Sequence, residues 1–278
     1  MSFEIQRGTL YIVPTPIGNL ADISERARQV LDKVSFIAAE DTRVSGKLLS
    51  LLGIKNNLVS YHEHNQEQSG KTIIERLLAG ESCAIVTDAG TPAISDPGQE
   101  LVSLCVSKGI CVVPLPGACA FVTALSASGF YSRRFCFEGF LPSEKSHRNE
   151  IIQQYKTEKK TVIFYEAPHR LKQTIKELYD ALGDRKICVA REITKLNEEI
   201  RQYTLGSFYE ELQVSQARGE YVLIIEGAQI EEAAFFENMS VEEHVGFYEK
   251  QGLSRMDAIK ACARDRHVPK NAIYKEFL

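Results

Sequence analysis

The sequence predicts an α/β protein with two α/β domains, the first on a parallel, doubly wound sheet and the second on a mixed sheet, before a small C-terminal helix-turn-helix-like segment. Three observations predict this fold. Short apolar runs alternate with helical spacing over residues 1–115, which is typical of a parallel sheet covered by helices. The composition changes after about residue 120, where strands and helices recur. Two short helical segments end the chain.

The elements of the first domain follow one another in regular alternation. Short, continuous apolar runs predict buried strands at residues 10–13, 35–39, 58–61, 84–87 and 110–114. Apolar residues at helical spacing predict helices at 22–34, 42–52, 73–79 and 100–107. Gly53, Gly80 and Gly109 follow three of these helices, as expected where a helix ends in a left-handed residue.

The rest of the chain is expected to form a second domain and a helical tail. Strands are predicted at residues 135–137, 161–165, 186–190 and 221–225, with helices between them. Residues 228–240 form an acidic linker or a short helix, followed by a helix at 254–264, a turn around 268–271 and a helix at 272–277. We therefore predict a first domain at residues 1–118, a second at 119–228 and a C-terminal segment at 229–278.

Several loops are expected to meet at one edge of the first sheet. In open α/β sheets, ligands bind beyond the carboxyl ends of the strands. Residues 14–19, 40–43, 62–65, 88–92 and 116–120 all follow predicted strands. Gly18 and Gly90 would let the backbone approach a ligand closely. The sequence therefore predicts a ligand site at this edge.

Composition and charge exclude several classes of protein. No apolar run is long enough to span a bilayer, and the start lacks a signal-peptide pattern, so we expect a cytoplasmic protein. The seven cysteines form no Cys-x-x-Cys pair and are expected to be buried, reduced thiols. The net charge of −4 argues against a protein that coats nucleic acid. Residues 251–278 carry six basic against three acidic residues, so any RNA contact should be local.

The loop motifs each allow a structural and a functional interpretation. The first loop is neither Gly-x-Gly-x-x-Gly nor a P-loop, which argues against NAD and ATP. In residues 40–43, Asp41 is expected to cap a helix, and the block also offers a substrate clamp or an acid–base group. In His62-Glu63-His64, the two histidines could bind a metal, but no further set of ligands is evident in the sequence. A substrate-facing loop is therefore favoured over a metal site. Residues 87–98 are expected to contact a ligand, and 164–170 form a helix entry or part of a site.

Eight blocks together resemble the tetrapyrrole-methylase-like (class III) methyltransferases. They keep their order and spacing over nearly the whole chain. The matching blocks are residues 10–20, 39–43, 60–65, 88–92, 138–142, 164–170, 190–195 and 219–223. The resemblance implies an S-adenosylmethionine-dependent enzyme that methylates the ribose 2′-oxygen of a decoding-centre cytidine, 1402 in 16S rRNA. It also implies a homodimer that acts on the small ribosomal subunit, with the cofactor folded between the two α/β domains.

The same resemblance assigns residues to the site. The cofactor contacts that it implies are Ile17, Thr91, Ile94, Cys119, Ala120, Glu166 and the strand that begins near Glu220. The loop segments add Pro16, Asp88, Gly90 and Tyr165 as predicted cofactor contacts. The candidate catalytic residues are Glu40, Asp41, Arg43 and His62, and no metal is expected. A carboxylate or imidazole could take the proton of the ribose hydroxyl, with His64 a further candidate, and these candidates are not ranked. Arg43 could instead hold a phosphate through two hydrogen bonds.

Two positions depart from the family pattern. Cys119 stands where the family often has serine, which puts a side-chain hydrogen bond in doubt but leaves a backbone contact possible. Thr87 stands where serine is commoner.

Two other functions remain open at this point. One is a methyltransferase of the same superfamily that acts on a tetrapyrrole. The other is a non-catalytic nucleic-acid-binding regulator that uses the C-terminal segment. That segment either docks RNA through Arg264, Arg266, His267 and Lys270, or only packs around a small core. The core would comprise Leu253, Met256, Ile259, Ile273 and Phe277.

Overall fold

The computed structural model describes residues 4–229, 235, 236 and 238–276. The chain divides into two compact units, Met1–Ala228 and Gln229–Leu278. Of the predicted segments, residues 230–234, residue 237 and Phe277 lie outside the described residues. The boundary at residue 118 stays a prediction.

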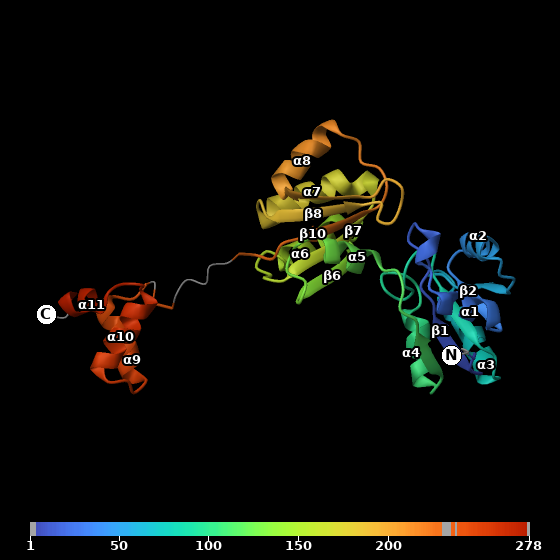
Figure 1. The fold of residues 1–278 in the computed structure, drawn as a ribbon, viewed down its shortest axis with the longest axis horizontal. Coiled ribbons are helices and arrows are strands. Elements are labelled where there is room, and N and C mark those ends of the chain that lie inside the picture. Colours follow the sequence, from blue (N-terminus) through green and yellow to red (C-terminus); the bar gives the residue numbers. More distant parts are fainter. Residues whose placement is uncertain (1–3, 230–234, 237, 277–278) are drawn as a thin grey trace. The chain divides into compact units, whose positions relative to one another are not determined.

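The first sheet, of which Figure 1 labels strands β1 and β2, is parallel throughout, as predicted. Its strand order is β3-β2-β4-β1-β5, and each neighbouring pair runs parallel. The strands are β1 (Thr9–Ile12), β2 (Phe36–Ala39), β3 (Leu58–Ser60), β4 (Cys83–Val86) and β5 (Cys111–Pro114). The connecting helices are η1 (Leu20–Asp22), α1 (Glu25–Lys33), α2 (Thr42–Leu52), α3 (Gln66–Leu78) and α4 (Gln99–Ser107).

Helices cover both faces of this sheet. Tyr11 and Ile37 face α1, where Val30 and Leu31 are buried. On the opposite face, Leu10 packs in one cluster with buried residues of α3 and α4. Burying each such aliphatic side chain contributes ~1.5–3 kcal/mol, so the two cores fix the strands and hence the loops at their ends.

The second sheet is mixed, again as predicted, and has one strand more than expected. Its order is β6-β7-β10-β8-β9, with β6 and β7 parallel and the remaining pairs antiparallel. The strands are β6 (Phe135–Phe140), β7 (Thr161–Glu166), β8 (Lys186–Arg191), β9 (Glu199–Thr204) and β10 (Tyr221–Ile225). The helices are α5 (Ala120–Ala127), α6 (Lys145–Gln154), α7 (Pro168–Leu182) and α8 (Leu205–Val214).

The two faces of the second sheet have different partners. Buried residues of α6, α7 and α8 share one core cluster with alternate residues of β7, β8 and β10. On the other face, Ala124 and Leu125 of α5 pack on the sheet, and Ile17 from the loop after β1 joins them. The first sheet's loop therefore contacts the second sheet directly.

The burial of the cysteines only partly matches the prediction. All seven are free thiols. Cys83, Cys105, Cys188 and Cys262 are buried, whereas Cys111 is exposed. The prediction was wrong for Cys111 because β5 is an edge strand of its sheet, with both ends exposed.

The second unit contains three helices among its described residues, α9 (Val241–Lys250), α10 (Arg255–Asp265) and α11 (Lys270–Glu276). Its core contains Val245, Ile259 and Ile273. The sequence prediction missed α9, and it was wrong to place Leu253 and Met256 in the core, since their side chains are exposed. None of the described helices is long and apolar enough to cross a bilayer.

Arg266, one of the basic residues predicted to contact RNA, is half-buried and forms hydrogen bonds within this unit. The Arg266 guanidinium donates to the Met239 carbonyl at 2.5 Å and, through Nε, to Nδ1 of His244 at 3.2 Å. His244 is fully buried, and burial, then the nearby Arg266, lowers its pKa. Arg266 thus links the end of α10 to α9 and to the residues before it, and a phosphate contact by its side chain stays a prediction.

Candidate active site

Three loops of the first sheet meet in the structure, as the sequence predicted. Thr15 and Gly90 exchange backbone hydrogen bonds at 2.9 and 3.1 Å, which joins the loops after β1 and β4. The Thr91 hydroxyl donates to the Ala118 carbonyl at 2.9 Å, which adds the loop after β5. Gly117 lies so close to Pro14 that a Cβ would overlap that ring, so only glycine fits there.

A cavity of about 460 Å³ lies beside these loops and reaches the second sheet. It is large enough for a nucleoside-sized ligand, since small-molecule sites span ~300–1,000 Å³. Its lining residues are Ile17, Glu40, Asp88, Ala89, Gly90, Thr91, Ile94, Ser95, Asp96, Cys119, Ala120, Phe140, Tyr165, Glu166, Ala167, Pro168, Ile193, Glu220, Tyr221 and Val222. None of these residues is a lysine, arginine or histidine.

Most predicted site residues lie on this cavity. Of the predicted cofactor contacts, only Pro16 is not among the lining residues. Of the four catalytic candidates, Glu40 lines the cavity and Asp41, Arg43 and His62 do not. Whether these residues bind a cofactor or act in catalysis stays a prediction.

The carboxyl ends of β2 and β4 bring carboxylates together at one wall of the cavity. Glu40 accepts a hydrogen bond from the Thr87 hydroxyl at 2.5 Å and one from the Asp88 backbone N–H at 3.4 Å. Asp88 in turn accepts from the Asp41 backbone N–H at 3.2 Å. Burial, followed by the charge of Glu40, raises the pKa of Asp88. The same two causes, in the same order, raise the pKa of Asp96 to about 6.

Asp41 and Arg43 form a pair just outside the cavity lining. Asp41 caps α2 by accepting from the Arg43 backbone N–H at 2.8 Å, which confirms the predicted cap. The Arg43 guanidinium also donates to both carboxylate oxygens of Asp41, at 3.1 and 2.6 Å. These hydrogen bonds lower the pKa of Asp41 to about 2. Asp41 is therefore a weak base at neutral pH, whereas the Arg43 side chain is 89% exposed and accessible to a substrate.

His62 is placed by its own loop. Its backbone N–H donates to Oδ1 of Asn65 at 2.8 Å, and its Nδ1 is buried without a hydrogen-bond partner. The rings of His62 and His64 lie edge to face, 6.0 Å apart. The structure therefore brings the two histidines together, but not onto the wall with Glu40.

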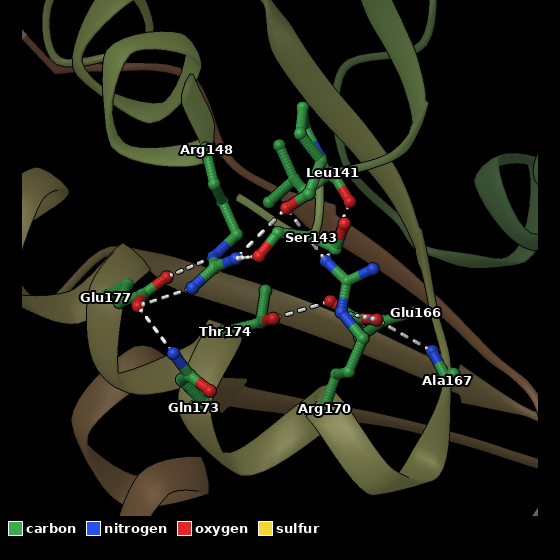
Figure 2. A network of polar contacts seen from close by, with 10 residues as sticks. Leu141, Ser143, Arg148, Glu166, Ala167, Arg170, Gln173, Thr174 and Glu177 are labelled. Carbon is green, nitrogen blue, oxygen red and sulfur yellow. Dashed lines mark hydrogen bonds and ion pairs between the residues drawn. The ribbon is translucent and has the colours of Figure 1, made fainter. Parts of the chain in front are cut away.

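Glu166 is buried at the wall of the cavity and is held by the protein's own donors (Figure 2). Its carboxylate accepts from the Thr174 hydroxyl at 2.5 Å and from the Ala167 backbone N–H at 2.8 Å. Arg170 lies 3.5 Å from the same carboxylate and also donates to the Leu141 carbonyl at 2.7 Å. With these partners, Glu166 fixes the start of α7, where Ala167 and Pro168 line the cavity.

A strained segment after β8 supports the opposite side of the cavity. Glu192 and Thr194 have positive φ angles of 51° and 65°, which cost ~1–3 kcal/mol each for residues other than glycine. Lys195 bridges the carboxylates of Glu192 and Glu220 at 2.9 and 2.8 Å. Gly18 packs against this segment so closely that a Cβ would overlap Cγ of Lys195. These contacts hold Ile193 on the cavity wall in spite of the strain.

Comparison with known proteins decides the family. A family model described as Tetrapyrrole (Corrin/Porphyrin) Methylases matches residues 9–209, which comprise the whole first sheet and strands β6 to β9 of the second and end within α8. The chain belongs to the tetrapyrrole methylase family. The resemblance inferred from the eight blocks is therefore confirmed.

The curated relatives cover nearly the whole of this methylase. Proteins named "Ribosomal RNA small subunit methyltransferase I" match it in Halalkalibacterium halodurans (47% identity, 98% of this chain and 95% of that protein) and Bacillus subtilis (46% identity, 100% and 97%). The protein of that name in Escherichia coli O157:H7 is 44% identical, with 100% and 97% covered. The methylase is thus an enzyme of the methyltransferase class, as predicted.

Solved structures share the fold of this methylase at low identity. A cobalt precorrin-4 methyltransferase superposes with a TM-score of 0.57 at 16% identity, over 79% of this chain and 95% of that protein. A uroporphyrin-III-C-methyltransferase from Thermus thermophilus gives 0.55 at 19% identity, over 79% and 94%. These similarities support the two-sheet architecture alone.

The sequence prediction missed part of the methylase's cavity. Asp96, Phe140 and Ile193 lie within segments that the sequence analysis singled out, but they were not selected as site residues. Positive φ angles at Ala93 and Ser95 turn the chain sharply beside Asp96. Neither residue type suggests such a conformation, so no local signal indicated that Asp96 would face the cavity.

Proposed function

We propose that this methylase uses S-adenosylmethionine to methylate the ribose 2′-hydroxyl of the decoding-centre cytidine, 1402, in 16S rRNA of the small ribosomal subunit. The near full-length match to relatives named "Ribosomal RNA small subunit methyltransferase I" carries this proposal. A homodimer and a cytoplasmic location, where small subunits are found, belong to the same proposal.

The chemistry of the cavity fits this cofactor. The lining contains carboxylates and no basic side chain, which disfavours polyphosphate ligands and favours a ligand with net positive charge. Its carboxylates are Glu40, Asp88, Asp96, Glu166 and Glu220. Small residues such as Gly90 and Ala120 leave backbone groups accessible to an adenosine or an amino acid moiety. The cavity therefore suits S-adenosylmethionine better than NAD or ATP.

The residues of the chain bind and orient the reactants. We expect Ile17, Gly90, Thr91 and Ala120 to hold the cofactor, which when bound supplies a methyl group on a sulfonium with a neutral thioether as leaving group. Positioning alone can supply ~7–11 kcal/mol of the barrier. Arg43, exposed beside the carboxylate wall, is available to hold an RNA phosphate.

The test of the proposal is transfer of labelled methyl groups by purified enzyme. Small subunits from a strain that lacks the modification are expected to accept label, and a precorrin is not. Label on the precorrin alone would support the tetrapyrrole alternative. Absence of cofactor binding in calorimetry would favour the non-catalytic regulator.

Arg43→Ala is expected to impair transfer to RNA by ~10-fold or more, because a charge-assisted hydrogen bond contributes ~1.5–3 kcal/mol. Cofactor affinity should stay near that of the wild type, since Arg43 does not line the cavity. Arg43→Lys keeps the charge but cannot form the bidentate hydrogen bonds of a guanidinium to phosphate, so it should recover only part of the rate. Calorimetry and single-turnover assays check this, and a wild-type rate for Arg43→Ala would leave the pair with Asp41 a purely structural role.

A chain ending at Ala228 is expected to keep its cofactor affinity and to bind small subunits more weakly. Ala228 is retained because its N–H donates to the Glu158 carbonyl at 2.6 Å. Binding should also depend less steeply on salt, by up to about one unit of slope for each lost phosphate contact. Lys270→Ala in the full chain should produce a smaller change in the same direction. Equal slopes and affinities for the full and shortened chains would show that the second unit does not contact RNA.

A further inference from the structure

Asp96 lies on the cavity wall, in a loop that is fixed on both sides. Ala93 and Ser95 adopt positive φ angles of 67° and 66°. Ser95 packs against Gly139 of β6 so tightly that a Cβ there would overlap the Ser95 Oγ. A Cβ added at Gly98 would lie 3.3 Å from Ala93, closer than an ordinary contact. The loop therefore delivers the Asp96 carboxylate to the cavity as a fixed group.

The other carboxylates near this wall already have donors from the protein. Glu40 accepts from Thr87 and from the Asp88 backbone, and Asp41 is paired with Arg43. Asp88 accepts from the Asp41 backbone N–H. Among the described residues, the hydrogen-bond donor of Asp96 is the Thr87 hydroxyl, which also donates to Glu40. A hydroxyl has one proton, so it donates to one of the two carboxylates at a time. Asp96 is thus the carboxylate of this wall with most capacity to accept a hydrogen bond from a substrate.

We propose that Asp96 is a catalytic residue of the methyl transfer, the group that accepts the proton of the ribose hydroxyl. The inference rests on the proposed function. As the hydroxyl oxygen forms its bond to the methyl carbon, the bond from that carbon to sulfur breaks and its electron pair remains on sulfur. The proton of the hydroxyl moves to a carboxylate oxygen of Asp96, which leaves a neutral carboxyl group, a methyl ether and a thioether.

The surroundings of Asp96 suit it to this task near neutral pH. Burial raises its pKa to about 6, with Glu40 and then Asp88 acting in the same direction and the Thr87 hydroxyl acting against them. Cys119, the residue before α5, and Tyr165 of β7 face it. A base is most effective when its pKa lies close to the working pH. Asp41, with a pKa of about 2, is far from that range.

The sign of the pH dependence follows from this assignment. Asp96 accepts a proton only when it is ionised, so activity is present above its pKa and is lost as the pH falls through about 6. The profile of kcat/KM reports groups of the free enzyme, so its acidic limb should fall in this range. Glu40→Gln removes the like charge with the larger effect on Asp96 and should move the limb to lower pH.

Asp96→Asn tests the proposal, because it keeps the size of the side chain and removes the base. The single-turnover rate on small subunits is expected to fall ~100-fold or more, since general bases contribute ~10²–10⁴. The acidic limb should disappear. Cofactor affinity in calorimetry should fall much less than the rate, by less than about tenfold, because four of the five lining carboxylates remain. NMR of cofactor-free protein with ¹³C-labelled aspartate measures the titration directly. The Asp96 carboxyl resonance is the one that is absent from the spectrum of Asp96→Asn, and in the wild type it should titrate near pH 6.

Each contrary result has a separate meaning. A wild-type rate for Asp96→Asn would overturn the proposal and leave the proposed function intact. Loss of cofactor affinity by more than about tenfold would also overturn it, because Asp96 would then be a cofactor contact. Failure of the wild-type enzyme to methylate small subunits would refute the proposed function, and the role of Asp96 with it.

Discussion

Arg148→Met is expected to lower the free energy of unfolding by ~3–5 kcal/mol, because it leaves a buried carboxylate without its partner. Arg148 is 5% exposed and Glu177 13%, and they form two hydrogen bonds at 2.6 and 3.0 Å. Arg148 also donates to the carbonyls of Pro142 and Ser143 (Figure 2). These residues follow closely after Phe140, which lines the cavity. Denaturant titration measures the loss.

Two controls isolate the buried ion pair. Arg148→Met combined with Glu177→Leu should recover much of the stability, because no uncompensated charge remains. Lys71→Met removes the lysine of an exposed pair with Glu67 and should have little effect. A near wild-type stability for Arg148→Met alone would contradict this role of the ion pair.

The same pair predicts how stability depends on pH. The hydrogen bond from Arg148 lowers the pKa of Glu177 below its ordinary value of 4.5 in the folded protein. The pair therefore contributes its full stabilisation above that value and loses it as the pH falls through the lower, folded-state pKa. Arg148→Met should flatten this part of the profile.

Gly90→Val is expected to weaken cofactor binding at least ~10-fold, or ~1.4 kcal/mol. Gly90 has a φ of 94°, a conformation that costs ~1–3 kcal/mol for other residues. A Cβ there would already contact Ile17 at 3.4 Å. The two further methyl groups of valine would therefore extend into the cavity or against the backbone bridge to Thr15. Calorimetry measures the affinity.

Gly109→Val is the matched control for backbone strain. Gly109 has a φ of 68°, but a Cβ there would meet no atom within 4 Å, and the residue does not line the cavity. The variant should lose stability and keep its cofactor affinity. Unchanged affinity in a folded Gly90→Val protein would remove Gly90 from the cofactor site.

The parts of the fold with strong local patterns could be predicted from the sequence. The five parallel strands are short apolar runs between helices, and burial on both faces makes them recognisable. β9 was missed because it is an edge strand whose residues are half-buried or exposed, so no apolar run marks it. α9 was missed although Ser240 and Glu243 form a capping box, a signal that sequence alone offers.

The candidate site was predictable where it depends on strand ends and not where it depends on distant contacts. The loops carrying Ile17, Gly90 and Cys119 meet because their strands are neighbours in one parallel sheet. Arg148 and Glu177 pair across 29 residues, and no local pattern indicates such a contact. Asp96 depends on two left-handed residues of types that rarely adopt that conformation.

The most direct test of the proposed function is to map the methyl group that the purified enzyme adds to unmodified small subunits. Digestion of the 16S rRNA and mass spectrometry of its fragments would locate the modified nucleotide. We expect one 2′-O-methylated cytidine, at position 1402, and Asp96→Asn should form it ~100-fold more slowly than the wild-type enzyme. A methyl group on a base, or at another nucleotide, would contradict the proposed function.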